Sequence, residues 1–340
     1  MAIDTTFNLT TVLASHPDFS RLALARLLTE VENDTPAGQE ALSQLFPLTG
    51  HAHLIGVTGS PGAGKSSIVN KLACYYRRAC GVERGAATPR RVAIVAVDPS
   101  SPFSGGAVLG DRVRMRDLTG DPGIFIRSMA SRGALGGLSH TTSAVVQVLD
   151  AAGFDMILIE TVGAGQAEVD VARLAHTTLV IEAPGMGDDI QAIKAGILEI
   201  ADILVINKAD RPGVDSTERS LRAMLEMARP GELDDFRQCG AGGEAVSWKV
   251  PVLRTVATAG AGIDDLAQAI DNHRRYLEES GEWACRENAR LQAEVEGLLR
   301  EKLLERWRSG LPEGAYESML AALEQRQLSP AEVVDWLMNR

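Results

Sequence analysis

Short apolar runs alternate with amphipathic stretches between about residue 53 and residue 280. Most of these runs are apolar at consecutive positions, which is typical of strands buried on both faces of a parallel sheet. The stretches between them carry apolar residues at helical spacing. This alternation predicts an α/β domain, a doubly wound and mostly parallel sheet covered by helices. The expected strands are residues 54–58, 91–97, 123–127, 156–160, 178–182, 203–207 and 250–256, and the expected helices are 66–78, 139–151, 166–175, 189–200, 215–228 and 263–278.

Helical patterns without strands flank this region on both sides. Residues 11–46 predict two helices separated by a turn cluster at 33–38, with the second helix over 40–45. After residue 280 the pattern predicts a long amphipathic helix over 283–307 and two short helices around 316–326 and 330–338. We therefore expect a helical N-terminal extension (1–50), a nucleotide-binding domain (51–280) and a helical C-terminal arm (281–340).

The long helix of the arm places apolar residues on one side. A helix of about 25 residues is about 37 Å long, which exceeds one compact domain, so we expect the arm to mediate homodimerisation. The alternative is that the stripe packs on its own domain. The stripe consists of Leu291, Val295, Leu298, Leu299, Leu303 and Trp307.

The charge of the chain narrows its partners. A net charge of −11 over 340 residues argues against a nucleic-acid-binding surface, which would need a basic face. The sequence contains neither an apolar run of about 18 residues nor a basic leader followed by an apolar stretch, so we expect no membrane association and a cytoplasmic location. Its four cysteines are too few and too scattered for a disulfide framework, so we expect thiols.

The strand at 54–58 leads into a GxxxxGK[ST] sequence, which is followed by a helix. Glycines in such a loop let backbone N–H groups surround a phosphate chain at the positive end of the helix dipole. Lys65 is expected to reach the β- and γ-phosphates, and the hydroxyl of Ser66 to bind Mg²⁺. The predicted phosphate loop consists of Gly59, Ser60, Pro61, Gly62, Ala63, Gly64, Lys65 and Ser66, and Ser67 is a further predicted nucleotide-binding residue.

Three acidic residues are candidates for a Mg²⁺ site. Asp98 and Glu160 each follow an apolar strand, and the ligand of a parallel sheet binds at the carboxyl ends of its strands. Glu160 begins ETVG, which resembles the DxxG switch of GTPases, and Gly163 is then expected to contact the γ-phosphate. Asp111 follows a glycine-rich loop at 104–110 and could complete the Mg²⁺ shell or position the attacking water. The alternative for each acid is a helix cap or a strand-end residue.

The sixth strand leads into Asn207-Lys208-Ala209-Asp210, an NKxD sequence. The carboxylate of Asp210 can accept hydrogen bonds from guanine N1 and N2, which adenine cannot donate, so we expect guanine specificity. Ala257, after the last strand, is a candidate for a backbone N–H contact to the guanine oxygen. Together with the phosphate loop, this sequence predicts a Mg²⁺-dependent GTPase that binds GTP and GDP.

The residue that drives hydrolysis is less evident. In Ras-like proteins a glutamine follows the glycine of DxxG and orients water. Here Ala164 follows Gly163, and Gln166 comes two positions later. We therefore expect slow hydrolysis by the isolated protein and acceleration by a partner.

Five segments together resemble the ArgK/MeaB-type GTPases, which associate with adenosylcobalamin-dependent methylmalonyl-CoA mutase. The resemblance runs from about residue 20 to the C-terminus. The switch at 96–115 and the GMGDDIQ sequence are its most specific parts. The segments are GSPGAGKS (59–66), AVDPSSPFSGGAVLGDRVRM (96–115), ETVGAGQAEVDVA (160–172), APGMGDDIQAIKAGILEIAD (183–202) and NKAD (207–210).

The resemblance implies a chaperone whose GTP state gates loading of adenosylcobalamin onto the mutase, or a related acyl-CoA mutase, and protects it. It implies homodimerisation through the C-terminal arm and no tightly bound B12 on this chain. It also implies a further mobile loop at Gly185–Lys194, in which Asp188 and Lys194 respond to nucleotide or partner. For Mg²⁺ it points to the set already named: Ser66, Asp98, Asp111 and Glu160.

Two other functions compete with this interpretation. Delivery of a metal ion to a metalloenzyme would need Cys/His clusters, and only His51 and His53 lie close together in the sequence. A scaffold with a structural nucleotide would not need the switch acids. Metal analysis and nucleotide turnover would separate these alternatives.

Overall fold

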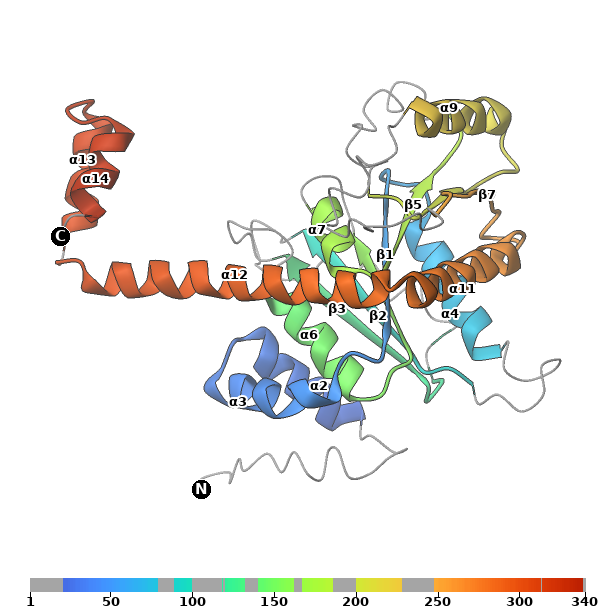
Figure 1. Ribbon diagram of the computed structural model, residues 1–340, viewed down its shortest axis with the longest axis horizontal. Helices are drawn as coiled ribbons and strands as arrows, with labels where there is room; N and C mark the ends of the chain where they lie inside the picture. Colours follow the sequence, from blue (N-terminus) through green and yellow to red (C-terminus); the bar gives the residue numbers. More distant parts are fainter. Residues whose placement is uncertain are drawn as a thin grey trace. The chain divides into compact units, whose positions relative to one another are not determined.

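Seven parallel strands form one sheet in the order β3-β2-β4-β1-β5-β6-β7 in a computed structural model of the chain (Figure 1). The structure describes residues 21–78, 89–99, 118, 120–131, 140–161, 167–185, 200–227, 248–312 and 314–338. Each of the seven expected strands coincides with an observed one, so the predicted parallel sheet is confirmed. The strands are β1 (His53–Gly59), β2 (Val92–Pro99), β3 (Ile124–Ser131), β4 (Met156–Thr161), β5 (Thr177–Glu182), β6 (Ile203–Ile206) and β7 (Val252–Arg254).

Helices cover both faces of the sheet. α4 (Lys65–Arg78) and α11 (Ile263–Ser280) pack on one face. α6 (His140–Ala151) and α7 (Ala167–Leu174) pack on the other face, and α9 (Val214–Met227) lies against β6 and β7. The expected helix at 189–200 lies almost wholly outside the described residues.

Alternate residues of the central strands enter two different hydrophobic cores. Ile55 and Val57 of β1 pack with α4 and α11, whereas Leu54 packs with α6 and α7. The same alternation divides Leu158 from Ile157 in β4. All four side chains of β6 are buried, although the strand is short. Burial on both faces explains the continuous apolar runs in the sequence.

The N-terminal helices pack on α6. They are α2 (Arg21–Glu32) and α3 (Pro36–Leu45), followed by a 3₁₀ turn over Phe46–Leu48. α3 begins before the expected residue 40. The side chain of Thr35 caps its N-terminus by accepting the N–H of Gly38 at 3.1 Å, and Pro36 occupies the first helical position, where it is favoured.

The chain divides into two compact units, residues 1–291 and 292–340. α12 (Glu282–Gly310) belongs to both, and α13 (Ala315–Glu324) and α14 (Pro330–Met338) follow it. Within the second unit the indole N–H of Trp307 donates to the carbonyl of Leu337 at 3.1 Å. None of the described helices combines the length and apolar character needed to cross a membrane.

Among the described cysteines, the expectation of a thiol is met at Cys74 and is wrong at Cys285. Cys74 is a free thiol, whereas Cys285, in α12, is disulfide-bonded. Spacing along the chain does not show which cysteines meet in space, because that depends on the tertiary fold.

Candidate nucleotide-binding site

The predicted phosphate loop connects β1 to α4, as expected from its sequence. Gly59 and Gly64 both have positive φ angles, of 125° and 97°. A Cβ atom at Gly59 would lie 2.0 Å from the carbonyl oxygen of Ile181, so only glycine fits against β5. The Lys65 ammonium lies across the loop and donates to the carbonyl oxygens of Gly59 at 2.7 Å and Ser60 at 3.2 Å. The loop therefore folds around this buried lysine.

The NKxD sequence lies directly beside the phosphate loop. The side-chain amide of Asn207 donates to the carbonyl of Ala63 at 2.8 Å. A Cβ atom at Gly64 would lie 2.4 Å from the same amide nitrogen, so the glycine permits this close approach. Lys208 has a φ angle of 57°, and its ammonium donates to the carbonyl of Gly62 at 2.6 Å. Two predicted motifs more than a hundred residues apart thus form one site.

Ala257 also contacts this sequence. Its N–H donates to Asn207 Oδ1 at 3.1 Å, and the Thr255 hydroxyl lies 3.2 Å from the same oxygen. A contact between Ala257 and a guanine oxygen would therefore share or replace this hydrogen bond. Asp210 is exposed, with its side chain available to solvent.

Two of the four predicted Mg²⁺ ligands are in direct contact. The hydroxyl of Ser66, at the start of α4, donates to Glu160 Oε1, at the end of β4, at 2.5 Å. Glu160 is 1% exposed. The backbone of Asp98 lies at the end of the neighbouring strand β2, two residues after the register partner of Glu160. The structure therefore gathers oxygen donors of the kind that Mg²⁺ prefers at one edge of the sheet.

The other predicted switch residues lie outside the described residues. These are Asp111, Gly163, Ala164, Gln166, Asp188 and Lys194.

The sequence did not predict the role of Glu182, the last residue of β5. Its carboxylate accepts a hydrogen bond from the Ser60 hydroxyl at 2.7 Å, and the side chain is 3% exposed. Its carbonyl oxygen accepts the N–H of Asn207 at 2.8 Å. Glu182 thus contacts both motifs. The one available signal was its position, since it is an acidic residue at the carboxyl end of a buried strand.

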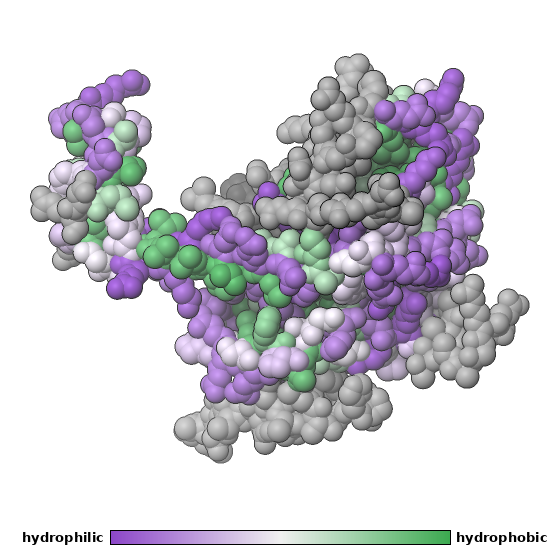
Figure 2. Space-filling view, viewed as in Figure 1, coloured by the Kyte–Doolittle hydropathy of each residue, from purple (hydrophilic) through white to green (hydrophobic). Residues whose placement is uncertain are grey.

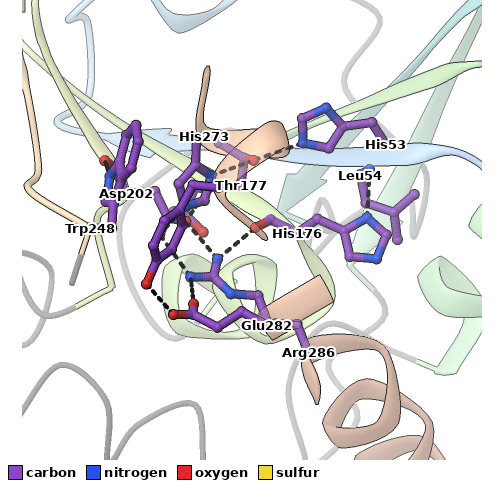
Figure 3. Close-up of polar contacts among 11 residues, drawn as sticks. His53, Leu54, His176, Thr177, Asp202, Trp248, His273, Glu282 and Arg286 are labelled. Atoms are coloured by element: carbon purple, nitrogen blue, oxygen red, sulfur yellow. Dashed lines mark hydrogen bonds and ion pairs between the residues drawn. The ribbon is translucent and has the colours of Figure 1, made fainter. Parts of the chain in front are cut away.

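A second buried polar cluster lies at the opposite, amino-terminal edge of the central strands (Figure 3). The carboxylate of Asp202, directly before β6, is contacted by the two terminal nitrogens of Arg286 at 3.1 and 3.2 Å. It also accepts the N–H of Thr178 at 2.7 Å. Arg286 donates in addition to the carbonyl of His176 at 2.6 Å. The cluster therefore attaches the beginning of α12 to β5 and β6.

Histidines complete this second cluster. His53 Nε2 and His273 Nδ1 lie 2.7 and 2.8 Å from the hydroxyl oxygen of Thr177. His273 Nε2 lies 3.2 Å from the Asp202 carboxylate. A proton on that nitrogen leaves Nδ1 to accept from Thr177, whose oxygen then accepts from His53. In that tautomer the hydrogen bonds run in one direction from His53 through Thr177 to His273.

Burial keeps His53 and His176 neutral. Burial and the neighbouring His176 hold the pKa of His53 well below its usual value, and burial also lowers the pKa of His176. His176 Nδ1 accepts the N–H of Leu54 at 3.1 Å, so its proton resides on Nε2, which lies 3.1 Å from Glu287. Burial alone would raise the pKa of Glu287, but hydrogen bonds from His176 and Arg290 lower it to about 2.

The chain is similar to known GTPases over most of its length. The family described as methylmalonyl Co-A mutase-associated GTPase MeaB matches residues 24–311. A putative GTPase of Pyrococcus abyssi is 42% identical over 319 residues, which cover 94% of this chain and 92% of that protein. GTPase ArgK of Escherichia coli is 37% identical over 286 residues, covering 83% and 80%. A crystal structure of an LAO/AO transport system kinase matches 100% of this chain and 98% of its own with a TM-score of 0.67 and 26% identity.

Proposed function

The chain belongs to the MeaB family of methylmalonyl-CoA mutase-associated GTPases, and from this we propose that it is a GTP-dependent chaperone of a B12-dependent mutase. The ArgK/MeaB resemblance of its motifs is thereby confirmed, and so is its assignment as a GTPase, which hydrolyses GTP to GDP and phosphate. The observation that carries the site assignment is the contact between the phosphate loop and the NKxD sequence at one edge of the sheet.

In the proposed complex the backbone N–H groups of residues 59–66 surround the phosphates at the N-terminus of α4. Lys65 donates hydrogen bonds to loop carbonyl oxygens in this structure, and it is placed to exchange these partners for phosphate oxygens. The carboxylate of Asp210 accepts from guanine N1 and N2, and adenine, which lacks both donors, leaves it unsatisfied. Base selection thus depends on one exposed carboxylate held beside the phosphate loop.

The residues at the end of β4 and the start of α4 fit a Mg²⁺ ion. Ser66 and Glu160 present adjacent oxygen atoms, and Asp98 and Asp111 are the further proposed ligands. A bound Mg²⁺ would neutralise negative charge on the β- and γ-phosphates. Glu160 holds the Ser66 hydroxyl in place, whether by a direct hydrogen bond or as a fellow ligand.

Hydrolysis by the isolated protein is proposed to be slow. No glutamine follows Gly163 directly, so the side chain that orients water in Ras-like proteins is missing at that position. We propose that the mutase accelerates hydrolysis and that GTP turnover gates adenosylcobalamin loading. B12 itself is proposed to bind the mutase and not this chain.

Self-association is proposed to use the C-terminal arm. Apolar side chains on α12 are more than half exposed, which is unusual for large aliphatic residues in a monomer. Figure 2 shows them as an apolar strip along α12. A second copy of the same helix would bury this strip in an isologous interface. The strip consists of Val295, Leu299, Leu303 and Leu304.

The test is GTP hydrolysis by the purified protein, alone and with an adenosylcobalamin-dependent mutase from the same source, with ATP as the control nucleotide. We expect slow GTP turnover that the mutase accelerates, and no ATP turnover. GTP turnover unaffected by any such mutase would retain the GTPase and refute the chaperone role. Metal analysis of the same preparation would then test delivery of a metal ion.

A further inference from the structure

Four residues of the nucleotide site close a ring of hydrogen bonds. The Ser60 hydroxyl donates to Glu182 Oε2 at 2.7 Å, and the carbonyl of Glu182 accepts the N–H of Asn207 at 2.8 Å. The side chain of Asn207 donates to the carbonyl of Ala63 at 2.8 Å, and the N–H of Ala63 donates to the carbonyl of Ser60 at 3.1 Å. The ring therefore joins the phosphate loop, the end of β5 and the start of the NKxD sequence.

Glu182 has a distinct place in this ring. It is the one charged member and the one that belongs to neither motif. Its side chain contacts the phosphate loop while its main chain contacts Asn207, so both motifs are hydrogen-bonded to the same residue of β5. The carboxylate is buried, and a hydrogen bond to a buried charged acceptor is among the stronger ones in proteins.

The backbone around the ring leaves little room for adjustment. Gly59 packs against Ile181, the residue before Glu182, where even a Cβ atom would collide with the strand. A Cβ atom at Gly64 would lie 2.4 Å from the side-chain amide nitrogen of Asn207. A loop whose two ends are confined in this way has its remaining freedom in the middle, and Ser60 and Ala63 are the two residues there that the ring holds.

We propose that Glu182 is a positioning residue that holds the phosphate loop in register with the guanine-binding sequence and thereby sets the affinity for GTP. The loop must present its N–H groups to phosphates at a fixed distance from the carboxylate that reads the base. Loss of the Ser60–Glu182 hydrogen bond lets the first turn of the loop move away from β5. Binding then has to order the loop, which weakens affinity without removing a group that contacts the nucleotide. The proposal rests on the GTPase activity of the family but not on the mutase partner.

Steady-state GTP hydrolysis by the full-length protein tests this proposal. Glu182→Ala should raise KM for GTP about tenfold with kcat changed less than about twofold. Glu182→Gln retains an acceptor oxygen for the Ser60 hydroxyl and should bring KM back to within about threefold of the wild type. Ser60→Ala should reproduce the effect of Glu182→Ala, and the double variant should be no worse than either. Glu226→Ala, at an exposed glutamate of α9, is the control and should behave as the wild type.

Each outcome decides the matter. Unchanged KM in both Ser60→Ala and Glu182→Ala would overturn the proposal. A Glu182→Gln variant as impaired as Glu182→Ala would also overturn it, because the charge and not the hydrogen bond would then be responsible. If Glu182→Ala fails to fold, Ser60→Ala, which removes only a hydroxyl, decides alone. Loss of all turnover even in the control protein would instead count against the GTPase assignment.

Discussion

The hydroxyl of Ser66 lies 2.5 Å from Glu160 Oε1, although 94 residues separate the two in the sequence. The contact joins the first turn of α4 to the end of β4, which pairs with β1, the strand that leads into the phosphate loop. The residue types expected to bind Mg²⁺ are therefore brought together by the sheet and not by proximity in the chain.

Replacement of Glu160 tests this pair. Glu160→Gln keeps the size of the side chain and an acceptor for Ser66 but removes the charge that would face Mg²⁺. We expect kcat for GTP to fall about 100-fold, because charge stabilisation at the phosphates is lost. The measurement is single-turnover hydrolysis at several Mg²⁺ concentrations. A variant with wild-type kcat at low Mg²⁺ would exclude Glu160 from the metal site.

Base specificity should reside in Asp210. Asp210→Asn replaces one acceptor by a donor, which matches xanthine better than guanine. We expect GDP affinity to fall about 100-fold and XDP affinity to rise, since an unmatched polar group in the site costs several kcal/mol at order of magnitude. Competition binding with the two nucleotides measures this. Asp264→Asn, at an exposed residue in the first turn of α11, is the matched control and should retain guanine preference.

Arg286 should contribute to folding and not to nucleotide binding. Its side chain is 7% exposed, and its partner Asp202 is 1% exposed. Arg286→Met would leave that carboxylate buried without this counter-charge and should lower the free energy of unfolding by about 3–5 kcal/mol. Urea unfolding followed by circular dichroism measures the loss. KM for GTP at a temperature where the variant is folded should stay within about threefold of the wild type, and a larger rise would show that the two edges of the sheet are coupled.

The neutral histidines predict a dependence of stability on pH. His53 and His176 have a lowered pKa in the folded protein, so the unfolded chain binds protons first as the pH falls below about 6.5. Stability should therefore decrease from pH 7.5 to pH 5.5, by up to about 1.4 kcal/mol per pH unit for each histidine. Glu287, with its pKa lowered to about 2, should add a further loss only at more acidic pH, below about 4.5. Urea unfolding at pH 7.5, 6.5 and 5.5 tests this.

Replacement of His53 tests this dependence separately. His53→Gln should reduce the slope, although the variant itself is less stable. An unaltered slope in His53→Gln would show that His53 does not titrate in the manner inferred.

The arm should control the oligomeric state. Leu299→Glu and Leu303→Glu each place a charge in the apolar strip of α12, and we expect a dimer in the wild type and a monomer in the double variant. Light scattering coupled to gel filtration gives the mass directly. Glu305→Gln, at an exposed residue on the opposite side of the same helix, should remain a dimer. A monomeric wild type would remove self-association from the proposed function.

Much of the fold could be predicted because its signals are local. The seven strands are continuous apolar runs, and the phosphate loop and NKxD are short segments in which neighbouring residues carry the chemistry. The start of α3 was predicted too late, because the cap formed by Thr35 and Pro36 outweighed a cluster of residues that usually form turns.

The features that escaped prediction are contacts between isolated residues. Glu182 meets Ser60 across 122 residues, and Asp202 meets Arg286 across 84 residues. No spacing rule connects such pairs, because the sheet register that brings them together is itself a result of folding. Cys285 belongs to the same class. Buried polar residues at strand ends therefore contribute to the site or to stability in this chain without belonging to a recognisable sequence motif.

The attachment of α12 to the sheet has a practical consequence for dissecting the protein. A fragment ending at residue 280, where α11 ends, would retain the phosphate loop and the NKxD sequence. It would lose Arg286 and Arg290 and leave the carboxylate of Asp202 in the interior without its arginine partner. We expect such a fragment to be recovered as aggregates or to be digested rapidly by proteases. A fragment that ends after residue 291 would keep both arginines. We expect this fragment to fold on its own, and it is the one to choose for expression or crystallisation.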